Sequence, residues 1–316
     1  MKPRLDVAAF GEVLWDLFEL PERGGARLYR RELGGAPCNV AVALARLGLR
    51  ASIVGAVGKD SFGADLAAAL EAQGVDVSSL SRLPNRTGIA FVRRDARGEP
   101  SFLFYRHDTA DMALAPRHLE PRMAKATFAL LGTSTLVREP LRAATRRFVQ
   151  LARRAGTHLV VDLNVRAHLW DNPATMRARI AELVKHAAVV KGSSVDLRAL
   201  GGPRFLAEHA PRAAVVVTAG ADPARAFGPF GEVERPARRA RCVDATGAGD
   251  AFVAGVLAVL ARRRALPGSA AFADPRVFSE ALDVGHMLGH KVVSKVGAVS
   301  GLVRLDAVRA KLEMRT

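Results

Sequence analysis

The chain has 316 residues, 49% of them hydrophobic, which is enough for one large α/β domain or two small ones. No apolar run approaches the about 20 residues of a membrane-spanning helix, the N-terminus has no signal-like apolar segment, and two cysteines exclude a disulfide framework, so a reducing cytoplasm is expected. The net charge of +16 would suit nucleic acid, but the arginines are scattered and only two Tyr and two Trp are present. We therefore expect no specific nucleic-acid binding, although a positive field attracts anionic small molecules.

Short apolar runs alternate with helical patterns along the chain. The predicted strands are 7–10, 51–57, 126–132, 158–163, 187–191 and 213–218, and the predicted helices between them are 36–47, 61–73, 139–155 and 174–186. Continuous apolar strands that alternate with helices are typical of a mostly parallel sheet covered on both faces. The sequence therefore predicts an α/β fold.

One region breaks this alternation. Residues 87–107 are predicted to form two strands joined by a turn at 95–99, and with 26–33 they would make a small antiparallel sheet outside the main one. Such a sheet is either a lid over a cleft or a plain edge hairpin. We expect a single domain over 1–316, with a β-lid built from about 17–33 and 86–108.

The stretch VDATGAGDAFVAGVL, residues 243–257, has the features of an anion site. Gly247, Ala248 and Gly249 precede Asp250 and an apolar run at 251–261 that is predicted to be a buried helix. The first N–H groups of a helix have no intrahelical partner, and small residues let a phosphate reach them. A carboxylate beside that phosphate could accept a proton from an attacking hydroxyl. The alternative is an ordinary glycine turn before an acidic helix start.

Four stretches together carry a family resemblance: GGAPCNVAVALARLG (34–48), FYRHDTADMAL (104–114), DLNVRAHLW (162–170) and VDATGAGDAF (243–252). The chain resembles the ribokinase-like (PfkB) family of sugar and nucleoside kinases over nearly its whole length, and the second and third stretches look most like fructokinases. The resemblance implies a ribokinase-like fold, ATP and Mg²⁺, and a homodimer formed through the lid. The chain has no GxxxxGK[ST] motif and so is not a P-loop kinase.

The resemblance also implies roles around the glycine turn. Asp250 matches the catalytic base, and the residues 247–249 match the anion hole. Asp244 and Thr246 match a monovalent-cation site, which makes K⁺ an optional activator. The segment 294–301, which contains Gly297, resembles the loop that completes this site and flanks the adenine.

On the sugar side, the resemblance assigns seven residues. Asp16 matches an acid at the end of the first strand, Arg166 would hold a phosphate or an acidic group of the substrate, and the full set is Asp16, Gly34, Gly35, Asn39, Arg106, Asp111 and Arg166. Glycine lets the backbone approach a sugar closely, and an amide both donates and accepts hydrogen bonds.

On the nucleotide side, the pattern departs from the family. The family's N-x-x-E is replaced by Ser193 and Asp196, and the assigned residues are Asn164, Ser193, Asp196, Thr218, Gly220, His286 and Gly297. His286 and His290 have the i, i+4 spacing of a metal pair, but no third ligand is near in sequence, so we interpret them as helix-face histidines.

The expected function is that of an ATP-dependent sugar kinase that phosphorylates a primary hydroxyl, with fructose as the expected substrate. A 2-keto-3-deoxygluconate kinase is one alternative, in which Arg166 would bind the substrate carboxylate. A nucleoside or aminoimidazole riboside kinase is another. From a different class, a sugar-binding regulator without catalysis is suggested by the segment 221–236, an unusual version of the family's nucleotide-side segment.

Overall fold

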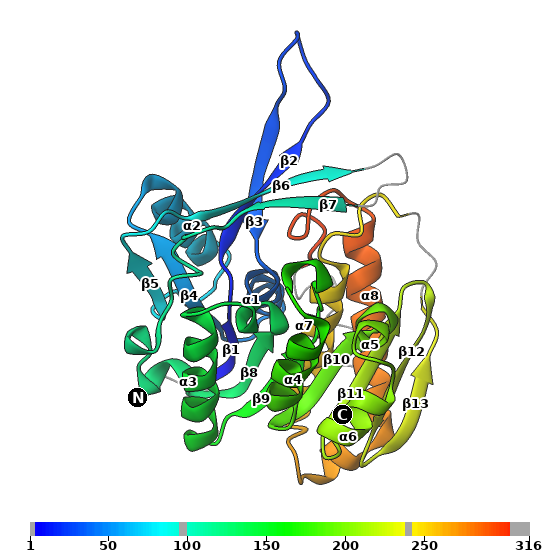
Figure 1. Ribbon diagram of the computed structural model, residues 1–316. Helices are drawn as coiled ribbons and strands as arrows, with labels where there is room; N and C mark the ends of the chain where they lie inside the picture. Colours follow the sequence, from blue (N-terminus) through cyan, green and yellow to red (C-terminus); the bar gives the residue numbers. More distant parts are fainter. Residues whose placement is uncertain (1–3, 95–99, 238–241, 304–316) are drawn as a thin grey trace.

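The computed structural model describes residues 4–94, 100–237 and 242–303, so the predicted turn at 95–99 lies outside the described residues. A nine-stranded sheet forms the centre of the molecule, in the order β13-β12-β11-β10-β9-β8-β1-β4-β5 (Figure 1). Its strands are β1 (Leu5–Phe10), β4 (Ala51–Gly58), β5 (Leu80–Leu83), β8 (Ala126–Gly132), β9 (His158–Asp162), β10 (Ala187–Ser193), β11 (Ala214–Ala219), β12 (Asp222–Gly228) and β13 (Gly231–Arg235). All neighbours pair in parallel except β11–β12 and β12–β13.

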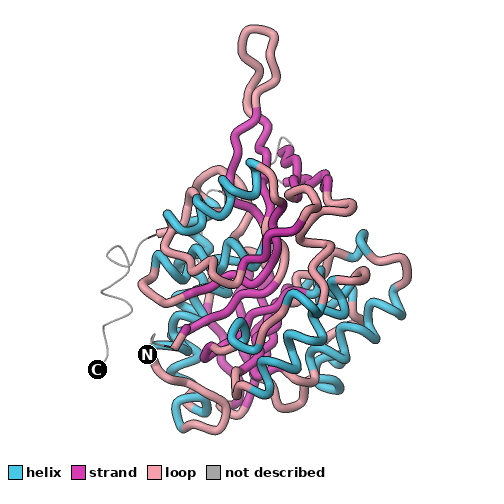
Figure 2. Tube along the Cα trace, turned by 90° about the vertical axis from the view of Figure 1, so that its left-hand side faces the viewer, coloured by secondary structure: helices cyan, strands magenta, loops and turns pink. Residues whose placement is uncertain are grey.

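Helices cover both faces of this sheet (Figure 2). One apolar cluster joins one face to α1 (Ala36–Arg46), α2 (Ser61–Ala72), α7 (Ala248–Arg262) and α8 (Pro275–Val293), and a second joins the other face to α3 (Leu141–Arg154), α4 (Pro173–Val184), α5 (Ser194–Ala199) and α6 (Arg204–His209). Within β1, Val7 and Ala9 pack in the first cluster and Ala8 and Phe10 in the second, because successive side chains of a strand point to opposite faces. The predicted two-faced α/β sheet is confirmed.

A separate four-stranded sheet, the lid, lies above the carboxyl ends of the main strands. It consists of β2 (Leu14–Glu19), β3 (Tyr29–Gly34), β6 (Gly88–Arg94) and β7 (Pro100–Tyr105), in the order β3-β2-β6-β7. The outer pairs are antiparallel as predicted, whereas the central pair, β2–β6, runs parallel. The connection between β2 and β3 projects at the top of Figure 1, and β2 begins at Leu14, ahead of the expected boundary at 17.

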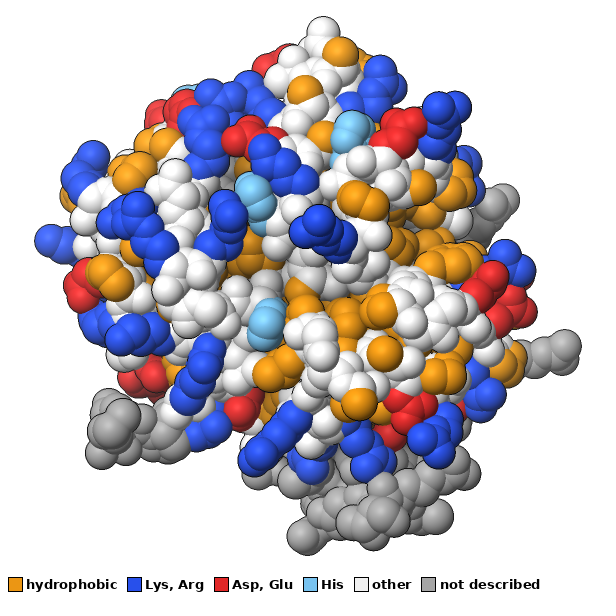
Figure 3. Space-filling view, turned by 90° about the horizontal axis from the view of Figure 1, so that it is seen from below, with side chains coloured by type: hydrophobic (Ala, Val, Ile, Leu, Met, Phe, Trp, Pro, Cys, Tyr) orange, Lys and Arg blue, Asp and Glu red, His pale blue; other side chains and the backbone are white. Residues whose placement is uncertain are grey.

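The segment 221–236, whose sequence is an unusual version of the family's nucleotide-side segment, contains the β12–β13 hairpin and extends the main sheet. No helix in the described ranges is long and apolar enough to cross a membrane. On the face seen from below, Lys and Arg side chains are dispersed, with acidic and apolar side chains between them (Figure 3). The basic charge on this face is therefore spread out, as the scattered arginines of the sequence suggest.

Candidate active site

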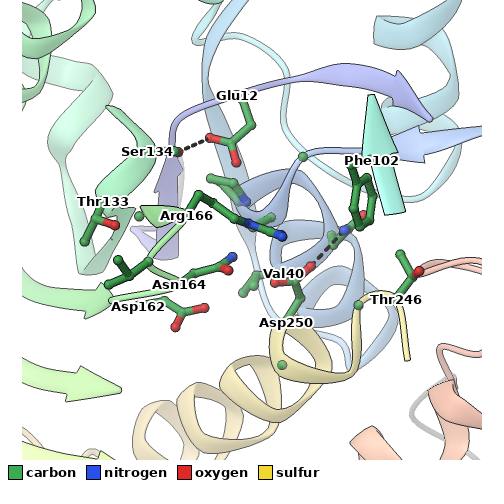
Figure 4. A pocket seen from close by; sticks show the side chains of 18 of the residues that line it. Glu12, Val40, Phe102, Thr133, Ser134, Asp162, Asn164, Arg166, Thr246 and Asp250 are labelled. Carbon is green, nitrogen blue, oxygen red and sulfur yellow. Dashed lines mark hydrogen bonds between the residues drawn. The ribbon is translucent and has the colours of Figure 1, made fainter. Parts of the chain in front are cut away.

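A cavity of about 440 Å³ lies between the carboxyl ends of the central strands, the N-terminus of α7 and the inner face of the lid (Figure 4). Open α/β sheets bind ligands at this edge because the loops that follow parallel strands meet there. The cavity brings together thirteen of the predicted residues: Asp16, Gly35, Asn39, Arg106, Asn164, Arg166, Ser193, Asp196, Thr218, Thr246, Gly247, Gly249 and Asp250. Residues more than 200 positions apart in sequence thus share one site.

The turn that opens α7 has a backbone that only glycine adopts easily. Gly247 has a φ of +77°, and a Cβ there would collide with Ala298. Ala248 already donates its N–H to the carbonyl of Ala245 at 3.2 Å. Helix geometry leaves the first four N–H groups without an intrahelical acceptor, so those of Gly247, Gly249 and Asp250 can still donate to an anion. The anion hole at 247–249 stays a prediction.

Asp250 is buried in the first turn of α7, with 9% of its surface exposed. Its Oδ2 accepts a hydrogen bond from Asn39 Nδ2 at 2.8 Å, so Asn39 contacts this carboxylate as well as the cavity. Burial raises the pKa of Asp250 to about 6; Asn39 lowers it and Asp162 raises it. Asn39 Oδ1 is buried with no partner among the described residues and can accept a hydrogen bond from a ligand.

Asp16 lies in the lid strand β2, and its predicted place at the end of the first strand is wrong. It is 4% exposed, and burial, followed by the charge of Asp250, raises its pKa to about 8. Gly34 does not line the cavity but leaves room for this side chain, because a Cβ at Gly34 would lie 2.5 Å from Asp16 Cγ. Gly35, with a φ of +100°, packs its backbone against the carbonyl of Glu12.

Two arginines reach the cavity with different surroundings. Arg106 forms an ion pair with the fully buried Asp111 at 2.6 Å, so its charge is neutralised within the protein. Asp111 itself does not line the cavity. Arg166 has no ion pair with any residue the structure describes, and its guanidinium lies 5.5 Å from the ring centre of Phe102. Figure 4 shows it extending into the cavity between Glu12 and Asp250.

Ser193 and Asp196 hold the neighbouring loop in place. Asp196 Oδ2 accepts hydrogen bonds from the N–H and hydroxyl of Ser193, each at 2.7 Å, and its Oδ1 accepts from Val165 N at 2.6 Å. The loop includes Asn164, whose φ of +34° is uncommon for a residue other than glycine. The acid that replaces the family's glutamate is therefore mainly engaged in positioning Asn164 and Arg166.

The remaining predicted residues lie around the cavity. Asp244 accepts hydrogen bonds from the N–H groups of Thr246 and Gly297, both at 2.9 Å, which ties the loop 294–301 to the glycine turn. Gly220 is exposed and does not line the cavity, and His286 contacts the carbonyl of Arg235 instead. In the described parts of the chain, no group of three or more His, Cys, Asp or Glu is placed to hold a metal.

Several lining residues were not predicted from the sequence, among them Glu12, Phe102, Phe104, Ser134 and Lys191. Glu12 is 9% exposed and accepts a hydrogen bond from the Ser134 hydroxyl at 3.0 Å. Lys191 could have been noticed because it is a charged residue within the apolar strand AAVVK. The two phenylalanines alternate with exposed residues along β7, a pattern that indicates two different faces.

The profile of the pfkB family of carbohydrate kinases matches residues 4–303. The chain belongs to this family. Fructokinase-1 of Oryza sativa subsp. japonica is 34% identical over 310 residues, which cover 94% of each protein. A structure of fructokinase with bound ATP from Xylella fastidiosa has a TM-score of 0.86 at 29% identity and covers 98% of each chain. A structure of fructokinase from Vibrio cholerae O395, in fructose, ADP and calcium ion bound form, has a TM-score of 0.82 at 28% identity and covers 98% of this chain and 99% of that one.

These similarities confirm the ribokinase-like fold that the motifs imply. They also make this pfkB protein a phosphotransferase that acts on a sugar hydroxyl. The cavity agrees with that chemistry, because a buried carboxylate lies at a helix N-terminus that can hold a phosphoryl group.

The raised pKa of Asp250 predicts the acid limb of the pH profile. Only the ionised carboxylate can accept the hydroxyl proton, so we expect kcat/KM to fall about tenfold per pH unit below a pH of about 6. The measurement is kcat/KM from pH 5 to 9, with the dissociation constant of the sugar followed over the same range. A flat profile down to pH 5 would contradict this assignment of the base.

Proposed function

We propose that this protein is an ATP-dependent fructokinase that phosphorylates a primary hydroxyl of fructose. The observation that carries the proposal is the single cavity that joins Asp250, at the N-terminus of α7, to the buried acid Asp16 on the lid. Its similarity to a plant fructokinase over 94% of the chain supports the same substrate. Glu12 adds a second buried acid near Asp16, so two carboxyl groups are available to hydrogen-bond the hydroxyls of a sugar.

In the proposed mechanism, Asp16 and Glu12 bind sugar hydroxyls while Phe102 and Phe104 of the lid exclude water. Asp250 accepts the proton of the primary hydroxyl, the sugar oxygen forms a bond to the γ-phosphorus, and the bond from that phosphorus to ADP breaks. The first-turn N–H groups of α7 donate to the phosphoryl oxygens. Phosphoryl transfer depends mainly on positioning and charge stabilisation, which are the two things this cavity supplies.

The residues present fit the expected cations. Mg²⁺ keeps much of its water and binds few protein carboxylates, and Asp196, which lines the cavity, could accept a hydrogen bond from that water while it also holds the loop of Asn164. Bound with the nucleotide, Mg²⁺ would neutralise phosphate charge. Thr246 Oγ1 is buried with no partner in the described chain, and with Asp244 it could form a site for an activating K⁺.

The proposal includes a homodimer formed through the outer face of the lid. Leu103 and Tyr105 are each 60% exposed there, and Tyr105 packs edge-on against Phe91 in the neighbouring strand. An apolar exposed face of this kind is typical of an interaction surface. We place the protein in the cytoplasm, where its cysteines, one of them buried, would stay reduced.

A panel of acceptors tests the proposal. We expect ADP release from ATP and Mg²⁺ with fructose and little release with ribose, 2-keto-3-deoxygluconate, adenosine or aminoimidazole riboside. Turnover on 2-keto-3-deoxygluconate alone would overturn the proposal and make Arg166 a carboxylate ligand, which its lack of an ion pair among the described residues permits. No turnover on any acceptor, with sugar binding retained, would indicate a regulator.

A further inference from the structure

A cavity of about 140 Å³ lies away from the active site and is lined by residues of α3 and α4. Its walls carry five basic side chains, namely Arg142, Arg146, Arg153, Arg179 and His186. The three arginines of α3 are spaced by about one and two helical turns, so the helix places them on one face. The mechanism above uses none of these residues.

The positive charge of this cavity is only partly balanced. The carboxylate of Glu139 pairs with two of the arginines, Arg142 at 2.7 Å and Arg146 at 3.4 Å. Arg153 forms no ion pair with any residue that the structure describes, and Glu182 is the one acid among the described residues that line the cavity. Four guanidinium groups therefore face two carboxylates. A concave surface lined mainly by one sign of charge concentrates ions of the opposite sign.

Arg179 is held by backbone oxygens instead of an acid. Its Nη1 donates to the carbonyls of Leu136 at 3.0 Å and Val137 at 2.7 Å, and within the described chain it makes no ion pair. Burial, followed by the positive charge of Arg142, lowers the pKa of Arg179. A phosphate oxygen carries more negative charge than a carbonyl oxygen, and a guanidinium can bind two phosphate oxygens at once. A phosphate in the cavity would therefore compete with the two carbonyls for Arg179.

The carbonyls that Arg179 holds belong to a segment that also lines the active site. Leu136 ends the 3₁₀ turn η3 (Thr133–Leu136), and Ser134 of this turn lines the active-site cavity. The Ser134 hydroxyl donates to Glu12, one of the two acids assigned above to the sugar hydroxyls. A movement of Arg179 away from η3 would therefore loosen the turn that positions Glu12.

We propose that the α3–α4 cavity is a regulatory site for a small phosphate-bearing molecule, whose oxygens bind the guanidinium groups of Arg153 and Arg179. The bound anion draws Arg179 away from the carbonyls of η3 and thereby weakens sugar binding at Glu12. The anion site goes beyond the proposed kinase function and does not depend on it, whereas its effect on the sugar rests on that function.

Binding is measured with inorganic phosphate and with glucose 6-phosphate. Mg²⁺ and a saturating β,γ-imido analogue of ATP are present, so that the phosphate positions of the active site are occupied. Trp170 is the reporter, because Arg179 Cζ lies 5.9 Å from the centre of its ring, and Trp170→Phe should abolish the signal. We expect a saturable fluorescence change with at least one probe. Tighter binding of glucose 6-phosphate would identify a phosphate ester as the ligand, and tighter binding of inorganic phosphate would identify the free ion.

Two neighbouring arginines of α3 give a matched pair of variants. Arg153→Met should raise the dissociation constant of the anion at least about tenfold, because a hydrogen-bonded charge is lost. Arg154→Met, at an exposed position outside the cavity, should bind the anion as wild type does. Absence of saturable binding to wild type, or equal binding to wild type and Arg153→Met, would overturn the inference.

The effect on the sugar is measured as the dissociation constant of fructose, or of the acceptor that the panel identifies, with and without saturating anion. The anion should raise this constant about fivefold or more in wild type and leave it unchanged in Arg153→Met. Arg179→Met, which removes both hydrogen bonds to η3, should weaken sugar binding without any anion. No effect of the anion on wild type would refute the regulatory role. Arg153-dependent anion binding in a protein that phosphorylates no acceptor would instead overturn the proposed function and support the anion site.

Discussion

Asp250→Asn should lower kcat by at least about 100-fold and leave the fold intact. Asn has the same shape, and its carbonyl oxygen can still accept the hydrogen bond from Asn39 that holds the side chain at 2.8 Å. What is lost is the ability to take a proton from the sugar hydroxyl. The measurement is steady-state turnover with fructose, together with calorimetric binding of fructose, which should change by less than about threefold if geometry is preserved.

Asp250→Asn should not lower the free energy of unfolding, because the pKa of Asp250 is raised in the folded state. The folded-state pKa of Asp250, about 6, is above its ordinary value of 3.8, so the native state loses stability as the pH rises from 3.8 through 6 and the buried carboxyl ionises. At pH 8 the Asn side chain avoids that charge, and Tm should be equal to or above that of wild type. Asp222→Asn, at an exposed position, serves as the control for both measurements. Normal turnover in Asp250→Asn would exclude Asp250 as the base.

Gly247→Ala should have the second largest effect. The residue has a φ of +77°, and its added Cβ would collide with Ala298 in the loop that closes over Asp244. The left-handed backbone alone costs about 1–2 kcal/mol for a residue with a Cβ. Because the turn aims the first N–H groups of α7, we expect kcat to fall by about 10²-fold or more.

Gly231→Ala is the control variant, because it adds the free-energy cost of a left-handed backbone without a steric collision. Gly231, the first residue of β13, has a φ of +84°, is exposed, and has no neighbour within 4 Å of an added Cβ. Its Tm should fall without loss of turnover. If Gly247→Ala also lost only stability, the glycine turn would have no direct part in phosphoryl transfer.

The main sheet could be predicted because its strands are continuous apolar runs that alternate with helices. The lid was harder: β2 pairs in parallel with β6, a partner about 70 residues away, and local periodicity carries no information about such a pairing. Asp16 was assigned to the end of the first strand from the family resemblance, and the structure places it in β2. The hairpin of β12 and β13 was missed because its polar, glycine-containing sequence resembles a loop.

The residues of the candidate site also fall into those that local sequence patterns could identify and those that only the structure brings together. Motif residues such as Asp250 and Asn39 could be identified from local patterns, although their mutual hydrogen bond could not. The sequence marks Lys191 only as a charged residue within an apolar strand, whereas its position opposite Asp162 depends on the register of β10 against β9. Glu12 likewise becomes a site residue only when Ser134, 122 positions away, is brought beside it.

Successive side chains of β7 face alternately into the cavity and outward, so the lining of the cavity depends on the register in which this strand pairs. Phe102 and Phe104 line the cavity, whereas Leu103 and Tyr105 face outward, with Leu103 paired to Phe91 and Phe104 paired to Ala90. A slip of one residue would exchange the two sets. The outward residues would then enter the sugar cavity, and the cavity wall would become the outer surface. An insertion or deletion of a single residue in this strand would therefore alter substrate binding and the exposed apolar face together, although each alternate position can be substituted independently.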